Sequence, residues 1–140
     1  MRAALIACAV LACVAPAIAQ SPKDVHLEKL RITPASPKPG EIVTATLRVR
    51  NGGATPAHVR LDMVLMAECS DLVGTLDQTH KQIPGGQRFI WQVTFPAPKV
   101  PRWALSVRAE LWPAGGEIQD MGRIDRRVGP GPFNKKCIAG

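Results

Sequence analysis

The chain has 140 residues and a formal net charge of +7, with 18 Lys and Arg against 11 Asp and Glu. This length is too short for two ordinary domains with separate cores. Three Trp, three Phe and no Tyr provide no evident stacking platform for nucleic acid. The excess of cations favours attraction to an anionic envelope polymer, a lipid head group or an acidic protein.

The first twenty residues, MRAALIACAVLACVAPAIAQ, have the order of a secretory signal peptide. Arg2 precedes an apolar run from 3 to 14, and Ala17-Ile18-Ala19 forms an A-x-A cleavage site. The run is shorter than the roughly 20 residues of a transmembrane helix, and no later stretch qualifies. We therefore expect residues 1–19 to be removed after Ala19, which leaves a soluble periplasmic or secreted chain with a charge of +6. A lipoprotein anchored at Cys13, in the imperfect lipobox Val10-Leu11-Ala12-Cys13, is the competing interpretation.

After this N-terminal segment, several short stretches alternate apolar and polar residues with a period of two. The clearest is 43–50, where Val43, Ala45, Leu47 and Val49 alternate with Thr and Arg, as in a strand with one buried and one wet face. Similar patterns predict strands at 25–33, 59–67, 89–95, 103–111 and 118–128, with a weaker one at 72–80. Pro- and Gly-rich turns separate them, and no segment has helical periodicity. The pattern predicts an all-β sandwich of about seven strands over residues 25–128.

Two cysteines, Cys69 and Cys137, remain after cleavage. In an oxidising compartment such a pair usually forms a disulfide. The closed loop of about 68 residues would contribute roughly 4 kcal/mol in the chain-entropy model. Neither a metal site nor a redox pair is supported, because C-x-x-C spacing is absent. We expect the bond to pin a C-terminal tail, residues 129–140, to the sandwich.

The segment "ITPASPKPGEIVTATLRVRNGGATPAHVRLDMVL" resembles the bacterial cell-adhesion-related domain family, CARDB. The likeness rests on a Pro-x-x-Gly-Glu opening at 37–41, a Val-x-Asn-x-Gly strand end at 49–53, and the later "IPGGQRFIWQVTFPAP". It implies an immunoglobulin-like antiparallel β-sandwich that acts as an extracytoplasmic binding or adhesion module. The closing segment departs from the family, since it carries Arg123, Arg126 and Arg127 where an Asn- and Glu-rich strand is common.

No catalytic set is evident. A G-x-S-x-G elbow is absent, and Arg60 and Arg108 flank Asp62 and Glu110, which favours a cross-strand salt-bridge ladder over an acid–base pair. We therefore expect a protein that is not an enzyme and has no cofactor.

A copper carrier that uses histidine and methionine ligands is an alternative function. Because His58 and Met63 should lie on opposite faces of one strand, and Met63 and Met66 likewise, we predict no metal site. The residues considered for such a site are His26, His58, His80, Met63, Met66 and Met121.

One sheet face has the composition of an interface. If the strands pair in immunoglobulin order, Arg60 and Arg108 share a face, and Val64, Met66 and Trp112 form its apolar end. Coverage by the closing strand or the C-terminal tail is the alternative. From this face and the signal peptide together we predict a non-catalytic exported module that binds a protein, an anionic envelope polymer or a second copy of the chain. A structural accessory subunit of an envelope complex is a further alternative.

Overall fold

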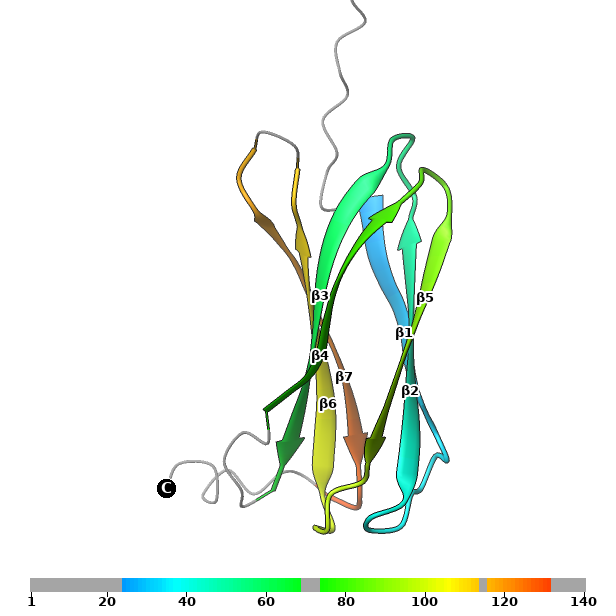
Figure 1. Ribbon diagram of the computed structural model, residues 1–140, viewed down its shortest axis with the longest axis vertical. Helices are drawn as coiled ribbons and strands as arrows, with labels where there is room; N and C mark the ends of the chain where they lie inside the picture. The colour runs from blue at the N-terminus through cyan, green and yellow to red at the C-terminus, as the bar shows by residue number, and fades with distance from the viewer. Residues whose placement is uncertain (1–23, 69–73, 114–115, 132–140) are drawn as a thin grey trace, which may run out of the picture.

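A computed structural model describes residues 24–68, 74–113 and 116–131. Within these ranges seven strands form two packed antiparallel sheets (Figure 1), which confirms the immunoglobulin-like sandwich. The three-stranded sheet has the order β1 (Val25–Thr33), β2 (Ile42–Asn51) and β5 (Arg88–Pro96). The four-stranded sheet has the order β4 (Gly74–Ile83), β3 (Ala57–Ala67), β6 (Trp103–Leu111) and β7 (Gln119–Val128).

Some predictions fall on residues that lie outside the described ranges. These are the signal peptide at 1–19, the lipid attachment at Cys13, the Cys69–Cys137 disulfide and most of the tail at 129–140. In the ranges that are described, no helix is long and apolar enough to cross a membrane.

The predicted strands and the observed strands agree closely except at β4. β1 and β6 have the predicted bounds, and β2, β3 and β5 extend the predicted runs by one or two residues at their ends. β4 differs, because it runs from Gly74 to Ile83 instead of 72–80. It is an edge strand with few buried side chains, so it carries little of the alternation that reveals a strand in a sequence.

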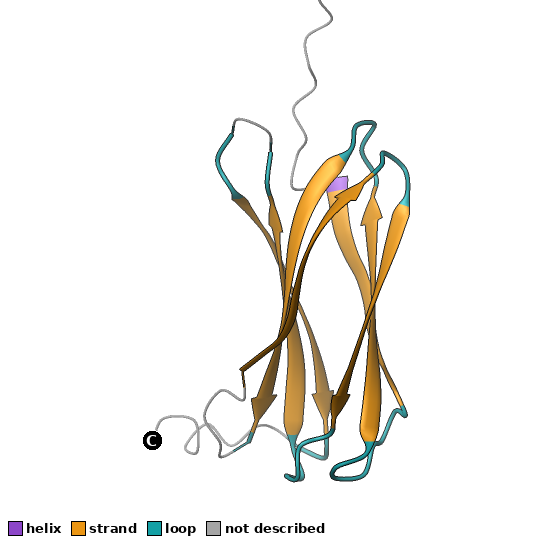
Figure 2. Ribbon diagram, in the orientation of Figure 1, coloured by secondary structure: helices purple, strands orange, loops and turns teal. Residues whose placement is uncertain are grey.

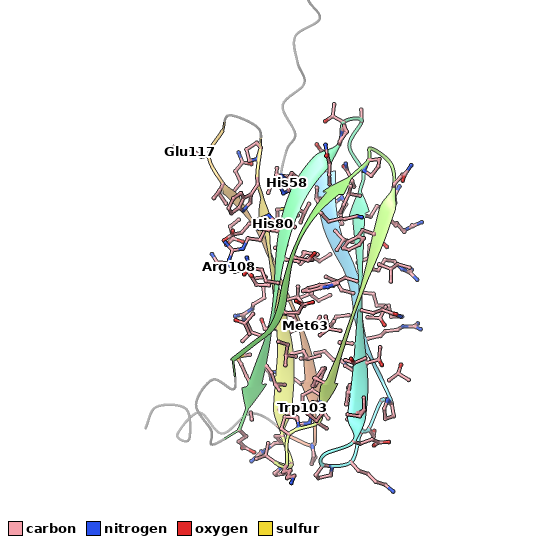
Figure 3. The ribbon with its side chains drawn as sticks, in the orientation of Figure 1. His58, Met63, His80, Trp103, Arg108 and Glu117 are labelled. Carbon is pink, nitrogen blue, oxygen red and sulfur yellow. The ribbon has the colours of Figure 1, made fainter. Side chains whose placement is uncertain are left out.

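The core lies between the two sheets and is built from alternate residues of the strands. Each large apolar side chain buried there contributes about 1.5–3 kcal/mol relative to an exposed position. Figure 3 shows Met63 and Trp103 between the sheets, where they are 0% and 2% exposed. The Trp103 ring meets Phe95 edge-on, with centroids 5.7 Å apart. Fully buried strand residues include Val43, Ala45, Leu47, Val49, Val59, Leu61, Val107 and Ala109.

Loops connect the strands at both ends of the sandwich (Figure 2). At one end they are held together by Asn51, which is fully buried. Its Nδ2 donates to the carbonyl oxygens of Thr55 at 2.8 Å and of Ile83 at 2.9 Å. Its Oδ1 accepts from the Gly53 amide at 3.0 Å. Since Asn51 ends a strand of one sheet and Ile83 ends a strand of the other, this side chain joins the two layers.

Candidate binding surface on the four-stranded sheet

The outer surface of the four-stranded sheet, called here the four-strand face, is set by the strand register. In β3, His58, Arg60, Asp62, Val64 and Met66 alternate with buried residues and therefore point outward. Arg60 lies opposite His80 of β4 and Glu110 of β6, and Asp62 lies opposite Arg108. The predicted sharing of one face by Arg60 and Arg108 is therefore observed.

Arg60 is held by acidic neighbours on its own strand and on β6. Its Nε lies 3.3 Å from Asp62 Oδ2, and its Nη1 lies 3.9 Å from Glu110 Oε2. On β6, Arg108 Nη2 lies 3.7 Å from Asp120 Oδ2 of β7. The cross-strand pair of Arg60 with Glu110 belongs to the ladder expected from the sequence, whereas Arg108 pairs with Asp120 instead of Asp62. The pairs are partly exposed, so each contributes little to stability, but together they restrict the position of the Arg60 guanidinium.

Trp112, just after β6, lies beside Arg60. The guanidinium carbon is 5.8 Å from the centroid of the Trp112 ring, within the range of a cation–π contact. The indole Nε1 donates to Glu110 Oε2 at 3.2 Å. Because Glu110 contacts both Arg60 and Trp112, the three side chains support one another's positions.

Two histidines complete this group. His58 Nε2 and His80 Nδ1 are 3.3 Å apart, and the His80 ring meets Trp112 edge-on with centroids 4.9 Å apart. Figure 3 labels both histidines near the loop end of β3 and β4. We call His58, Arg60, His80, Glu110 and Trp112 the Trp112 cluster. The sequence did not reveal the role of the histidines, since only the β3–β4 pairing brings together residues 22 positions apart.

The expected apolar end of this face is not formed, which corrects that part of the interface prediction. Trp112 donates its amide to the His58 carbonyl, whereas Val64 lies six residues further along β3, or about 20 Å away at the usual strand rise. Val64 and Met66 are only half-exposed. Their outward-pointing neighbours Ala104 and Ser106 are 3% and 7% exposed. Arg60 and Trp112 are half-exposed as well, but they lie beside the exposed His58 and His80, so the more accessible part of the face is at this end.

Of the histidines and methionines considered for copper, His58 and His80 come together, but the methionines and His26 do not join them. Met63 is buried between the sheets, Met66 lies toward the far end of β3, and His26 belongs to the other sheet. Over residues 24–68, 74–113 and 116–131, no group of three or more His, Cys, Asp or Glu side chains is placed to hold a metal ion.

A cavity of about 520 Å³ lies at the opposite end of the sandwich. Its lining includes Pro37, Pro101, Pro130 and Trp103, and Arg127 is its one charged side chain among the described residues. The lining also holds the Ser36 hydroxyl, but it offers no acidic or imidazole side chain among the described residues to act as a base for that hydroxyl. We place no reaction there.

Comparisons with known proteins identify the fold. No family model matches the chain, and no curated protein matches it. Its structure is similar to the ASH/PapD-like domain 7 of human CEP192, with a TM-score of 0.54, 15% identity, and coverage of 89% of this chain and 97% of that one. It is also similar to the C-terminal domain of wzt, with a TM-score of 0.50, 12% identity, and coverage of 79% and 77%.

Two enzymes also contain a similar unit. For a Paenibacillus sp. cycloisomaltooligosaccharide glucanotransferase the TM-score is 0.55 at 20% identity, over 74% of this chain. For the Pseudomonas fluorescens alkylpurine DNA glycosylase AlkC it is 0.50 at 11% identity, over 76%. The chain spans only 13% and 31% of those proteins. At such identities these likenesses show the fold alone, and that fold is an immunoglobulin-like β-sandwich.

Proposed function

We propose that this chain is an exported, non-catalytic binding module of the CARDB type. It recognises a protein partner through the Trp112 cluster on the four-strand face. The observation that carries the proposal is the meeting of Trp112, Arg60 and the two histidines on one outward surface.

The composition of the cluster supports recognition of a protein. Trp and Arg are the residues most enriched among those that dominate binding energy at protein interfaces. Trp91 and Trp103 are buried in the core, whereas Trp112 is half-exposed on the sheet surface. A tryptophan at such a position is poorly explained by packing of the sandwich itself.

The Arg60 side chain is already positioned before any partner arrives. Asp62 and Glu110 hold its guanidinium, and Glu110 also accepts from the Trp112 indole. Binding therefore loses less side-chain entropy than it would with a freely rotating arginine, whose immobilisation costs about 0.5–1.5 kcal/mol.

The turns that carry the family likeness adopt the conformations that their residues favour. Gly40 has φ +78° and donates to the Ala97 carbonyl at 2.9 Å. Asn51 satisfies the Gly53 amide at the end of β2. Export rests on the pattern of residues 1–19, which has the order of a signal peptide.

The test compares affinity capture from an envelope fraction by three immobilised proteins: the wild type, Arg60→Glu/Trp112→Ala, and Arg48→Glu/Ile90→Ala. The last pair makes the same type of change on the outer surface of the other sheet, where Arg48 lies opposite Ile90. Far-UV circular dichroism and thermal melting establish that all three are folded. Elution volume reports pairing with a second copy of the chain.

We expect a protein to be retained by the wild type and by the Arg48/Ile90 variant, and to be lost with the Arg60/Trp112 variant. Equal retention of partners by all three proteins, with no change in elution volume, would refute the role of the Trp112 cluster.

A further inference from the structure

The two outer surfaces of the sandwich differ sharply in charge. On the outer surface of the three-stranded sheet, called here the three-strand face, the cationic side chains are Lys29, Arg31, Arg48, Arg50 and Arg88. All five are exposed, and Glu28 is the one carboxylate beside them on these three described strands. The formal charge of this face is therefore +4.

The four-strand face is balanced by comparison. Along β3, β6 and β7 the register directs outward four arginines and four carboxylates: Arg60, Arg108, Arg123, Arg127, Asp62, Glu110, Asp120 and Asp125. The excess positive charge of the sandwich is thus concentrated on one sheet. A charge surplus needed only for solubility would have no reason to be segregated in this way.

The cations of the three-strand face also oppose one another directly. Arg50 lies opposite Arg88, and Lys29 lies opposite Arg48. Like charges at directly opposite positions of neighbouring strands are destabilising. Glu28 relieves part of this repulsion, because its carboxylate lies 3.2 Å from Arg88 Nε and 4.0 Å from Arg48 Nε. A cluster that costs stability in the isolated fold points to an external anion that neutralises it.

The rest of the face is polar. Thr33, Thr44 and Thr94 lie side by side across the three strands, and Gln92 lies opposite Thr46. The aromatic side chains of β5 point inward or lie beside the core, with Trp91 and Phe95 buried. The surface therefore offers charge and hydrogen-bonding groups, and only Ile42 and Ile90 as exposed large apolar side chains.

We propose that the three-strand face binds a linear anionic polysaccharide. Arginine guanidinium groups pair with carboxylates in two-point contacts, and four of the five cations are arginines. The hydroxyl and amide groups of the threonine and glutamine positions match the hydroxyl groups of sugar units. A protein interface would need a more apolar and aromatic centre. A bilayer would need more apolar side chains than two isoleucines to enter the acyl boundary.

This surface is separate from the Trp112 cluster, so the inference stands independently of the proposed protein-binding function. The test measures binding of alginate, a linear polyuronate, with neutral dextran as the uncharged control. Isothermal titration is performed at about 50 mM salt and repeated at about 1 M, where the Debye length falls to about 3 Å. Vesicles of phosphatidylglycerol and of phosphatidylcholine are run in parallel by co-sedimentation.

Two triple variants separate a site from general charge. Arg48→Gln/Arg50→Gln/Arg88→Gln removes three cations from the three-strand face. Its matched control, Arg123→Gln/Arg126→Gln/Arg127→Gln, removes three exposed cations from β7 and leaves the same net charge. If each lost pair contributes about 0.5 kcal/mol, alginate affinity falls about tenfold in the first variant. We expect little change in the control. Glu28→Gln frees Arg48 and Arg88 and should strengthen binding.

We expect alginate binding that disappears at high salt and that only the Arg48/Arg50/Arg88 variant weakens by about tenfold. We expect no binding of dextran. Three results would overturn the proposal: no alginate binding at low salt, equal weakening by the two triple variants, or binding to phosphatidylglycerol vesicles without binding to alginate. The last result would assign the face to a membrane surface. Loss of alginate binding with the Trp112 cluster intact leaves the proposed protein-binding function unaffected.

Discussion

Replacement of Asn51 is the sharpest test of how the two sheets are joined. Asn51→Ala removes three hydrogen bonds: two donated by Nδ2 to the Thr55 and Ile83 carbonyls, and one accepted from the Gly53 amide. The Ile83 contact is fully buried, and the other two are partly buried. A buried polar group left without its partner costs about 1–3 kcal/mol.

We assign about 2 kcal/mol to the buried Ile83 carbonyl and about 0.5 kcal/mol to each of the other two contacts, which water can partly replace. The expected loss in the free energy of unfolding is therefore about 3 kcal/mol. With a urea m-value of about 1.5 kcal/mol/M, the unfolding midpoint falls by about 2 M. Urea titration followed by tryptophan fluorescence measures it. Gln92→Ala, on an exposed position of β5, is the control and should change stability by less than about 0.5 kcal/mol.

Asn51→Asp separates hydrogen bonding from packing. The aspartate has nearly the same shape and keeps an acceptor for the Gly53 amide, but it loses both donors and places a carboxylate against two carbonyl oxygens. We expect a loss at least as large as that of Asn51→Ala. An Asn51→Asp protein as stable as the wild type would refute the reasoning, because shape alone would then account for the residue.

Three further outcomes are expected. Trp103→Ala should lower the free energy of unfolding by about 3–5 kcal/mol in urea titration, because the ring is 2% exposed and packs on Phe95; a loss below 1 kcal/mol would contradict this packing. Mass spectrometry of the alkylated mature protein should show Cys69 and Cys137 protected, and Cys137→Ser should lose about 4 kcal/mol; free thiols would exclude the bond. N-terminal sequencing of the exported protein should begin directly after Ala19; an acylated N-terminus at Cys13 would favour the lipoprotein.

The strand positions could be predicted from the sequence because a strand with one buried face alternates apolar and polar residues. Val43, Ala45, Leu47 and Val49 are all fully buried, as their alternation indicates. This alternation is weakest in the edge strand β4, where Ile83 is the one buried side chain and the predicted bounds differ from the observed ones. The pairing of β7 leaves no periodic signal either, because a bulge between Ala109 and Glu110 shifts its register against β6.

The composition of the candidate surfaces depends on which strands pair with each other. The alternation of apolar and polar residues shows which side chains point outward, but it does not show which strands are neighbours. The sequence alone placed Arg60 and Arg108 outward, but it joined Trp112 to Val64 and Met66, which the register separates by most of the length of β3. His80 reaches Trp112 only because β4 lies next to β3.

The segregation of charge likewise exists only after β1, β2 and β5 form one sheet. By itself the sequence determined the strands and the inward face of each, because these follow from local order and a period of two. It also predicts export, from the pattern of residues 1–19. The tertiary structure decided which outward side chains become neighbours, because pairing depends on the closure of loops and on the fit of the two sheets across the core.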